Sequence, residues 1–562
     1  MRTRARGRRA LLRALCWAFL LAACGASARA DGSRPLELPI AGLPTSREAW
    51  VRLDTENFRI LSSAETERTL RLARQIEGLH DAISRVTRFE PVSPVPTWIY
   101  IFSDDVALTP YKHLYRGEPA SMSGALYSRP WGDYIAMNGK SAEARVTVFH
   151  EYLHVVLRNN LPGIPLWLEE GLAEFFSTFT LEGQKQRRSP QGDLDGVIGR
   201  PVPWHARALR QGERTPLGEI LRASPRSEIY NRFEHQGEFY ARSWELVHYL
   251  LIGNPERRVD ALRYLTLSFE GLAQDEAFRR AFGGGYDVLE RELEDYRRDG
   301  YASRRLRLPA TSARLASTAV TPLPYPRVLS HLGELLHSQG GREGDAGFHF
   351  EQAVERDPTL GGAIAGLGLI ARENGDLPRA RALFQRAAAA GDDARSHYLY
   401  GSSLLAFGRA VGREKIREAL GHVERSLALD AEFAPAWAAL GQARRLASPQ
   451  GERPQAAAAM PSDPQIALKL LMLHSRARNQ GAAREVWEGF FDPRPASPEK
   501  RAAARILGRL EWLSADGPAP DLLGEGFLAP PAAPPPRKVA PPPRQRGERA
   551  PRGPAGRGPG GL

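Results

Sequence analysis

A Gly that follows a large apolar or aromatic residue recurs through the C-terminal half of this 562-residue chain. The four dipeptides are spaced by 35, 33 and 40 residues, and they are Leu332-Gly333, Leu367-Gly368, Tyr400-Gly401 and Leu440-Gly441. The first three are each followed by an apolar and a small residue, namely Phe350 with Ala353, Phe384 with Ala387, and Val423 with Ser426. A period of this length predicts stacked helix pairs, because one pair alone cannot bury its apolar face.

These units resemble the tetratricopeptide repeat, which has Gly in its first helix and a small residue in its second. The resemblance implies an all-α superhelix over residues 322–515, whose concave face binds a protein partner or an extended substrate. The segment from Ile466 to Phe491 is expected to add a degenerate helical pair. The alternative for this region is a generic helical bundle.

The positive charge of the chain lies at its two ends. The formal net charge is +12, which first suggests nucleic-acid binding. Residues 1–30 contain seven Arg and no acid, and residues 531–562 contain six Arg and one Lys against one Glu, which leaves a net charge of −1 for residues 31–530. A specific nucleic-acid partner is therefore not expected. The Pro- and Arg-rich residues 517–562 cannot bury enough apolar surface to fold, so a disordered tail is predicted.

Residues 1–30 have the pattern of a secretory signal peptide, with a basic segment, ten apolar residues from Ala14 to Ala23, and small residues after them. Cleavage after Ala30 follows an Ala-x-Ala site, whereas Leu21–Cys24 resembles a bacterial lipobox and would leave Cys24 lipidated. An uncleaved anchor is the third alternative, although ten apolar residues are too few to span a bilayer. We expect an exported protein, located in the bacterial periplasm, on the outer membrane as a lipoprotein, or outside the cell. Contact with a membrane is expected only through the signal or the lipid.

The two cysteines of the chain, Cys16 and Cys24, both lie within the predicted signal. The mature protein is therefore expected to form no internal disulfide. Thiol catalysis and zinc–thiolate sites are excluded for the same reason.

The segment between the signal and the repeats combines strands and helices. Alternating or continuous apolar runs predict strands at residues 50–53, 57–61, 97–102 and 134–137. Apolar residues at helical spacing predict a helix over residues 64–86. Because these elements precede a long helical stretch and do not alternate with it, residues 45–305 are predicted to form an α+β domain.

The sequence His150-Glu151-Tyr152-Leu153-His154 lies within a predicted helix, residues 142–158, with Ser141 as its N-cap. Two His residues four positions apart lie on one face of a helix, so both imidazoles can bind one metal ion. Glu151 follows the first His and would point toward a water on that metal.

A second motif offers a third ligand. After a short loop with two prolines the chain continues Leu166-Trp167-Leu168-Glu169-Glu170-Gly171-Leu172-Ala173-Glu174. A carboxylate on a second, antiparallel helix would complete three protein ligands and leave one position open. Together with HExxH, this segment resembles the W-L-x-E-G-x-A motif of gluzincin metallopeptidases, and the resemblance spans about residues 48–300.

The resemblance implies a gluzincin-like domain with one zinc ion held by His150, His154 and Glu170. Glu151 would act as general base and then general acid in peptide hydrolysis. Glu174 matches a position where members place an acid that hydrogen-bonds a ligand His.

The acid next to Glu170, Glu169, is expected to be solvated. Gluzincins also use a Tyr or His to stabilise the oxyanion, and Tyr240, ahead of a helix predicted over residues 244–251, is the candidate for this role. Tyr230 and His235 are secondary candidates, and His248 is expected to be a core or surface residue.

The leading hypothesis is an exported zinc endopeptidase whose repeats recruit a substrate or a protein partner. Aminopeptidase specificity is not implied, because the G-x-M-E-N motif of that branch is missing. The closest resemblance is to peptidase-MA-like bacterial proteins that carry HExxH and C-terminal tetratricopeptide repeats. The alternatives are an inert peptidase-fold scaffold that acts through its repeats in envelope assembly, and a helix pair with a polar cluster and no metal.

Overall fold

The structure, a computed structural model, describes most of the chain between residues 42 and 514. The described residues are 42–89, 91–115, 117–119, 124–182, 194–210, 215–231, 233–308, 319–390, 393–406, 408–448 and 460–514. The predicted signal peptide with Cys24 and the predicted tail, 517–562, lie outside the described residues.

A mixed six-stranded sheet, in the order β11-β1-β2-β3-β7-β6, forms the centre of the N-terminal part. Its strands are β1 (Val51–Asp54), β2 (Phe58–Ser62), β3 (Thr97–Phe102), β6 (Gly124–Arg129), β7 (Gly132–Asn138) and β11 (Thr321–Pro322). β2, β3 and β7 are parallel, and β1 and β6 pair antiparallel on either side. The sequence pattern does not predict β6. In this strand Ala125, Leu126 and Tyr127 are all buried, so no alternation of polar and apolar residues marks it.

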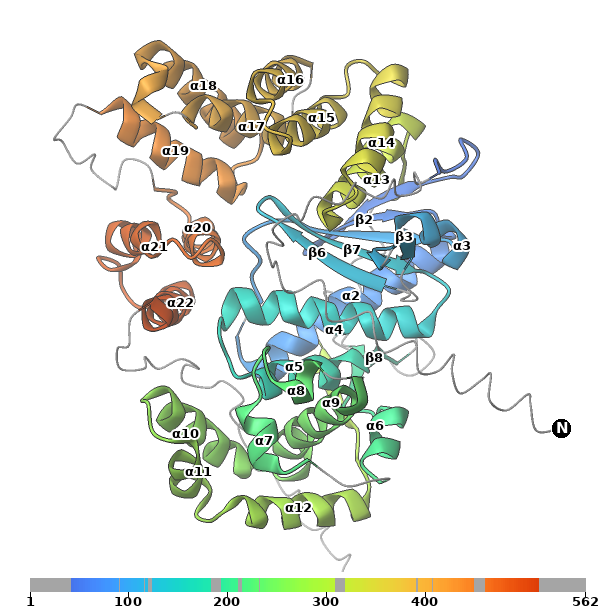
Figure 1. Cartoon of the computed structure of the whole chain (residues 1–562), viewed down its shortest axis with the longest axis vertical. Helices are drawn as coiled ribbons and strands as arrows, with labels where there is room; N and C mark the ends of the chain where they lie inside the picture. The colour runs from blue at the N-terminus through green and yellow to red at the C-terminus, as the bar shows by residue number, and fades with distance from the viewer. Residues whose placement is uncertain are drawn as a thin grey trace, which may run out of the picture. The chain divides into compact units, whose positions relative to one another are not determined.

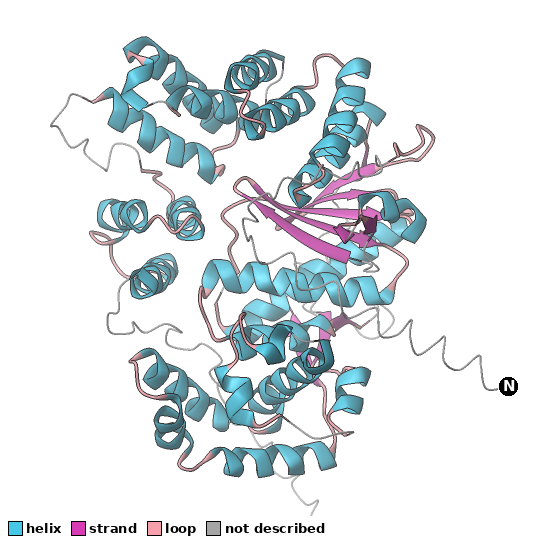
Figure 2. Cartoon of the chain, in the orientation of Figure 1, coloured by secondary structure: helices cyan, strands magenta, loops and turns pink. Residues whose placement is uncertain are grey.

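Helices make up most of the rest of the described chain (Figure 2). Up to residue 299 they are α2 (Thr66–Thr87), α3 (Asp105–Leu108), η1 (Thr109–Tyr111), α4 (Ala142–Asn160), α5 (Leu166–Ser177), α6 (Pro203–Ala208), α7 (Leu217–Arg222), α8 (Glu228–Asn231), α9 (Phe233–His248), η2 (Tyr249–Gly253), α10 (Arg257–Phe269), α11 (Gln274–Phe282) and α12 (Tyr286–Asp299). Two small sheets join them, β4 (Leu114–Tyr115) with β5 (Glu118–Pro119), and β8 (Thr180–Leu181), β9 (Leu194–Ile198) and β10 (Arg304–Leu308). The α+β prediction for this region is confirmed.

Both faces of the large sheet are covered, and the side chains of β3 alternate between two cores. Ile99 and Ile101 pack in one core with residues of α2 and α4. Tyr100 and Phe102 pack in the other core with the first repeat helix, α13. Figure 1 shows α2 and α4 on one side of the sheet and α13 on the other. The sheet is therefore shared between the core of the HExxH helix and the core of the repeats.

The repeat region consists of helix pairs. Its helices are α13 (Tyr325–Gln339), α14 (Glu343–Arg356), α15 (Gly361–Glu373), α16 (Leu377–Ala390), α17 (Ala394–Leu405), η4 (Gly408–Val411), α18 (Arg413–Leu429), α19 (Ala434–Ala447), α20 (Pro464–Arg476), α21 (Gln480–Val486), η6 (Trp487–Phe491) and α22 (Pro498–Ser514). The apolar and small residues predicted to pack in the second helices are all buried.

The repeated glycines allow the two helices of each pair to approach closely. A Cβ atom on the first three would lie too close to the apolar residue of the second helix: 2.7 Å for Gly333 and Phe350, 2.6 Å for Gly368 and Phe384, and 2.9 Å for Gly401 and Val423. The predicted packing is thus confirmed for α13/α14, α15/α16 and α17/α18. Gly441 of α19 has no such neighbour among the described residues, since the atom nearest to its Cβ position belongs to Arg445 of the same helix.

The turn between β6 and β7 packs against helices of the repeats. The ring of Trp131 is nearly parallel to that of His337 in α13, with 6.5 Å between the centroids. The guanidinium carbons of Arg372 and Arg395 lie 5.9 and 5.3 Å from the Trp131 ring centroid. Arg129 donates a hydrogen bond to the carbonyl oxygen of His337. The repeats therefore support the hairpin that carries β6.

The last helices contact the HExxH region again. Arg476 of α20 forms an ion pair of 2.9 Å with the fully buried Asp133 of β7. Arg509 of α22 donates hydrogen bonds to the carbonyl oxygens of Pro162 and Gly163, in the loop between α4 and α5. The contacts of Arg509 restrain the loop that joins α4 and α5.

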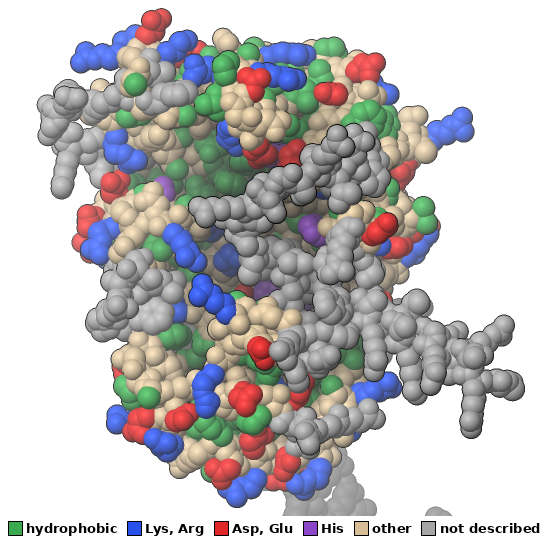
Figure 3. All heavy atoms as spheres, in the orientation of Figure 1, with side chains coloured by type: hydrophobic (Ala, Val, Ile, Leu, Met, Phe, Trp, Pro, Cys, Tyr) green, Lys and Arg blue, Asp and Glu red, His purple; other side chains and the backbone are tan. Residues whose placement is uncertain are grey.

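Acidic and basic side chains are interspersed over the lower helices, around α11 and α12, in Figure 3. Ion pairs such as Arg280 with Glu276 and Arg291 with Asp287 join neighbouring turns there. This mixture agrees with the near-neutral charge of residues 31–530. Within the described part of the chain, no helix has both the length and the apolar character needed to cross a membrane.

Candidate metal centre

The helix that carries HExxH begins where the sequence predicts. Ser141 accepts a hydrogen bond of 3.0 Å from the backbone N–H of Ala144 through its hydroxyl oxygen, so it is the N-cap of α4. The helix continues to Asn160, whose side-chain amide donates to the carbonyl oxygen of Val156. The helical period places His150 and His154 one turn apart on the same face.

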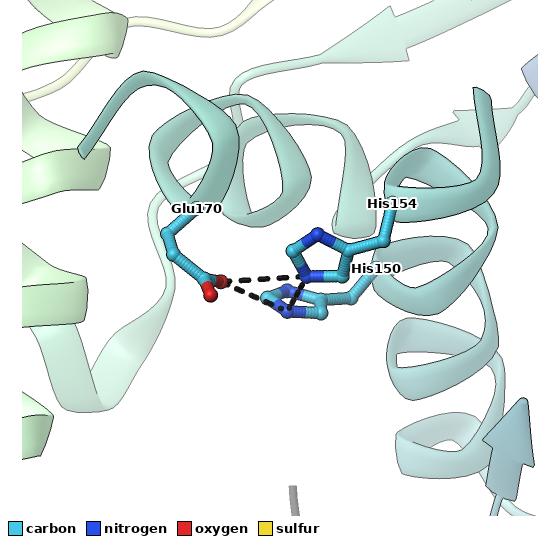
Figure 4. Close-up of side chains that lie close together, drawn as sticks. All are labelled: His150, His154 and Glu170. Carbon is cyan, nitrogen blue, oxygen red and sulfur yellow. Dashed lines mark hydrogen bonds and ion pairs between the residues drawn. The ribbon is translucent and has the colours of Figure 1, made fainter. Parts of the chain in front are cut away.

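The orientation of α5 depends on Gly171. A Cβ atom at this position would lie 2.4 Å from the carbonyl oxygen of Ser243 and 2.5 Å from the side chain of Val247, both in α9. Only Gly permits this approach of two helices. The close contact fixes the rotation of α5, and the side chain of the preceding residue, Glu170, points toward α4 (Figure 4).

Three donor atoms from α4 and α5 meet in a buried triangle (Figure 4). Nε2 of His150 lies 3.0 Å from Nε2 of His154, and each of these nitrogens lies 3.4 Å from Oε2 of Glu170. His150 and Glu170 are 6% and 3% exposed. The predicted ligands therefore come together, although they belong to two helices and 20 positions of sequence separate His150 from Glu170.

The triangle has the size that a tetrahedral zinc site requires. Bonds of about 2.0–2.1 Å at tetrahedral angles place donor atoms about 3.3–3.4 Å apart. The buried Oε2 of Glu170 accepts no hydrogen bond from the described residues. A buried carboxylate oxygen without a donor is unfavourable unless a cation lies beside it. The residues present thus fit a metal ion.

The charges of the three groups are strongly coupled. Burial alone would lower the pKa of His154, but the negative charge of Glu170 and a hydrogen bond with Glu169 outweigh burial, and the pKa is raised well above its ordinary value. Burial raises the pKa of Glu170, and the positive charges of His154 and His150 reverse this and lower it. Without a metal, protons on the imidazoles balance the carboxylate, so a metal ion must displace protons to bind.

Two further carboxylates lie beside the Nδ1 atoms of the two imidazoles, on the side of each ring away from the triangle. Oε1 of Glu174 lies 3.4 Å from Nδ1 of His150. Oε1 of Glu169 lies 3.0 Å from Nδ1 of His154. The expectation that Glu169 is solvated is therefore wrong, because its carboxylate contacts His154. The neighbouring carboxylate of Glu170 lies between His150 and His154. Each carboxylate favours the tautomer that leaves Nε2 free for a metal.

His205, in α6, is a member of this network that the sequence does not indicate. Its Nε2 lies 3.1 Å from Oε2 of Glu174, and the residue is 2% exposed. Glu174 thus lies between His150 and His205. No motif surrounds His205, so only the packing of α6 against α9 brings it to the site.

Two tyrosines border the group. The hydroxyl of Tyr230 donates a hydrogen bond of 2.8 Å to Oε1 of Glu170. The ring of Tyr240 lies 6.2 Å from that of His150, and it belongs to α9 itself, which begins well before the predicted helix at 244–251. Burial, and next the charge of Glu170, raise the pKa of both tyrosines, so both remain protonated donors.

Of the two remaining candidate His residues, His248 does not join the group. His248 is buried in the core, where it contacts the Tyr296 hydroxyl and the Gly199 carbonyl oxygen, both at 2.7 Å. The side chain of His235 lies outside the described residues.

Glu151 follows His150 in the sequence, and its side chain is half-buried. It forms no hydrogen bond or ion pair with any residue that the structure describes. Burial raises the pKa of its carboxyl group, and the neighbouring His154 and His150 partly oppose this effect. The carboxyl group of Glu151 is therefore available to a ligand.

No protein-family model matches the chain, and no curated protein matches it. Several solved structures do. They include a thermophilic TPR protein of Thermus thermophilus (19% identity, 32% of this chain and 98% of that chain, TM-score 0.23) and Pseudomonas aeruginosa pilF (19%, 33% and 84%, TM-score 0.21). YrrB, a TPR protein with an unusual peptide-binding site, is 18% identical over 31% of this chain and 88% of its own, with a TM-score of 0.19.

The chemistry of the site is therefore judged from its own geometry. His150, His154 and Glu170 form a buried group that could hold a metal ion. Glu169, Glu174 and Tyr230 surround this group and restrain each of its members.

Proposed function

We propose that this protein is a zinc-dependent metallopeptidase of the gluzincin type, with His150, His154 and Glu170 as metal ligands. The observation that carries the proposal is the donor triangle, whose sides of 3.0, 3.4 and 3.4 Å suit tetrahedral zinc. Two imidazoles and one carboxylate leave a fourth position open, which is the ligand set of catalytic zinc. Magnesium and calcium prefer more ligands, all of them oxygen.

The chain's own residues can perform the proton transfers of peptide hydrolysis. When bound, a zinc ion supplies a Lewis acid for the scissile carbonyl and lowers the pKa of a water molecule to about 7. The carboxylate of Glu151 accepts the proton of the attacking water and then donates it to the leaving amine. Glu169 and Glu174 hold the two imidazoles in place during these steps.

The edge strand β6 offers a place for the substrate. It is the last strand of the described sheet and contacts α4. An extended peptide can add to such an edge through backbone hydrogen bonds. We therefore propose that substrates bind in extended form along β6 and are cleaved internally.

The other expectations also remain proposals. The protein would be exported, as a soluble periplasmic or secreted protein or with a lipid on Cys24, and its repeats would bind a substrate or a protein partner. The alternative function is that of an inert scaffold acting through the repeats. The packing of Trp131 against α13, α15 and α17 favours this alternative, because the repeats already bind another segment of this chain.

Metal analysis and chelation test the proposal. Purified full-length protein is expected to contain one zinc ion per chain and to cleave internal bonds in a peptide library. Removal of zinc with a chelator should abolish cleavage, and added zinc should restore it. A folded, undialysed sample that contains no zinc, or contains iron in its place, would overturn the proposal.

The two tyrosines are expected to differ in role. Because Tyr230 is hydrogen-bonded to a metal ligand, Tyr230→Phe should weaken zinc binding by about 10- to 100-fold. Tyr240→Phe should retain zinc and lower kcat by about 10²- to 10³-fold, as expected for loss of an oxyanion donor. Zinc titration and steady-state kinetics of both variants separate these effects, and the reverse pattern would exchange the two roles.

A further inference from the structure

A pocket of about 480 Å³ lies between α2, the N-terminal end of α4 and the strand β8. Five basic side chains line it, namely Arg68 and Arg71 of α2, Arg145 of α4, Lys140 and Arg200. Glu182 is the one acidic residue among the lining residues that the structure describes. Around α11 and α12, by contrast, acidic and basic side chains are interspersed.

Carboxylates compensate the charge of this pocket only in part. Arg71 pairs with Glu67 on the adjacent turn, and Lys140 pairs with Asp104. Glu182 is 3.8 Å from Arg200 and also 3.4 Å from Arg305.

Arg68 and Arg145 form no ion pair with any described residue. Their guanidinium groups donate instead to backbone carbonyl oxygens, Arg68 to Gly139 at 3.4 Å and Arg145 to Phe179 at 2.6 Å. Two positive charges therefore remain without a counter-ion in this part of the described chain.

Arg145 is held in place for a ligand. Besides the hydrogen bond to Phe179, its guanidinium carbon lies 5.4 Å from the ring centroid of the buried Phe149. Burial and then the charge of Arg200 lower the pKa of Arg145. Two guanidinium groups that repel each other in a partly desolvated pocket are stabilised by a bound anion.

The pocket is separate from the metal centre. Arg145 precedes His150 by five residues on α4, and residues that share a helix face are three or four apart. The pocket therefore faces α2 and β8, whereas the two His residues face α5. Ligand binding here does not depend on whether the proposed peptidase is active.

We propose that this pocket binds a phosphate-bearing ligand through Arg68, Arg145 and Arg200. Guanidinium groups match the oxygen geometry of phosphate with paired N–H donors. The lining of the pocket contains four more basic than acidic side chains. This excess of positive charge suits a polyvalent oxyanion better than a single carboxylate. The shared chemistry is that of a free phosphate compound or of a phospholipid headgroup.

Calorimetry with inorganic phosphate and co-sedimentation with vesicles test this site in the full chain. The vesicles contain phosphatidylcholine alone or with phosphatidylglycerol. Wild-type protein is expected to bind phosphate, the anionic vesicles, or both, and Arg145→Gln should weaken that binding by about 10- to 100-fold. Binding of phosphate alone identifies a soluble ligand, and binding of anionic vesicles alone identifies a headgroup.

One control variant and a second variant of the pocket complete the experiment. Arg291→Gln removes the same charge from an exposed ion pair on α12 and should leave binding within about twofold of the wild type, since surface pairs contribute little. Arg200→Gln changes an exposed residue and should weaken binding without affecting folding. The proposal is overturned if wild-type protein binds neither probe, or if Arg145→Gln and Arg200→Gln bind as well as Arg291→Gln does. The last outcome would assign binding to the basic tail, which all variants share.

Discussion

Glu151→Gln is expected to abolish peptide-bond cleavage while the protein still binds one zinc ion. The substitution keeps the shape of the side chain and removes the group that accepts and returns the proton, and general-base catalysis of this kind contributes about 10²- to 10⁴-fold. Glu151 makes no hydrogen bond or ion pair with the described residues, so folding should not change. Cleavage of a peptide library, zinc content and thermal unfolding measure the three properties.

Glu143→Gln is the matched control for this variant. Glu143 lies in the first turn of the same helix and is exposed, so its loss should leave cleavage unchanged. Equal activity of Glu151→Gln and wild type would refute the general-base role. A Glu151→Gln strain that behaves like the wild-type strain, although the purified variant is inactive, would favour the scaffold function.

Gly171→Ala is expected to destabilise the protein by about 3 kcal/mol, because the new methyl group overpacks a helix contact. Its Cβ atom would meet the backbone of Ser243 at 2.4 Å, and backbone cannot turn away as a flexible side chain can. The shift of α5 away from α9 would also move Glu170, so zinc affinity should fall together with stability. Urea unfolding and zinc titration measure both effects.

Gly421→Ala provides the opposite expectation in the same chain. Gly421 lies inside α18, is exposed, and has no atom within 4 Å of its Cβ position. Alanine should therefore stabilise that helix by about 0.5–1 kcal/mol. If Gly171→Ala is as stable as wild type, the close packing of α5 on α9 is wrong, and so is the explanation of Gly in the motif.

Local periodicity determined the parts of the site that the sequence revealed. Residues four apart on a helix share a face whatever the rest of the fold does, so His150 and His154 could be paired from their spacing. The cap at Ser141 acts within one turn of α4 and was equally visible. The glycines of the first three repeats pack on the next helix along the chain, so their spacing could also be recognised in the sequence.

Only the tertiary structure decided which distant groups meet. Whether Glu169 is solvated or contacts His154 depends on the angle between α5 and α4, and that angle depends on the contact of Gly171 with α9. His205 and Tyr230 reach the site through packing between segments, and nothing in their local sequence marks them. Periodicity is a property of one segment, whereas such contacts are a property of pairs of segments. This is why the sequence indicated the candidate metal ligands but not all of the residues that contact them.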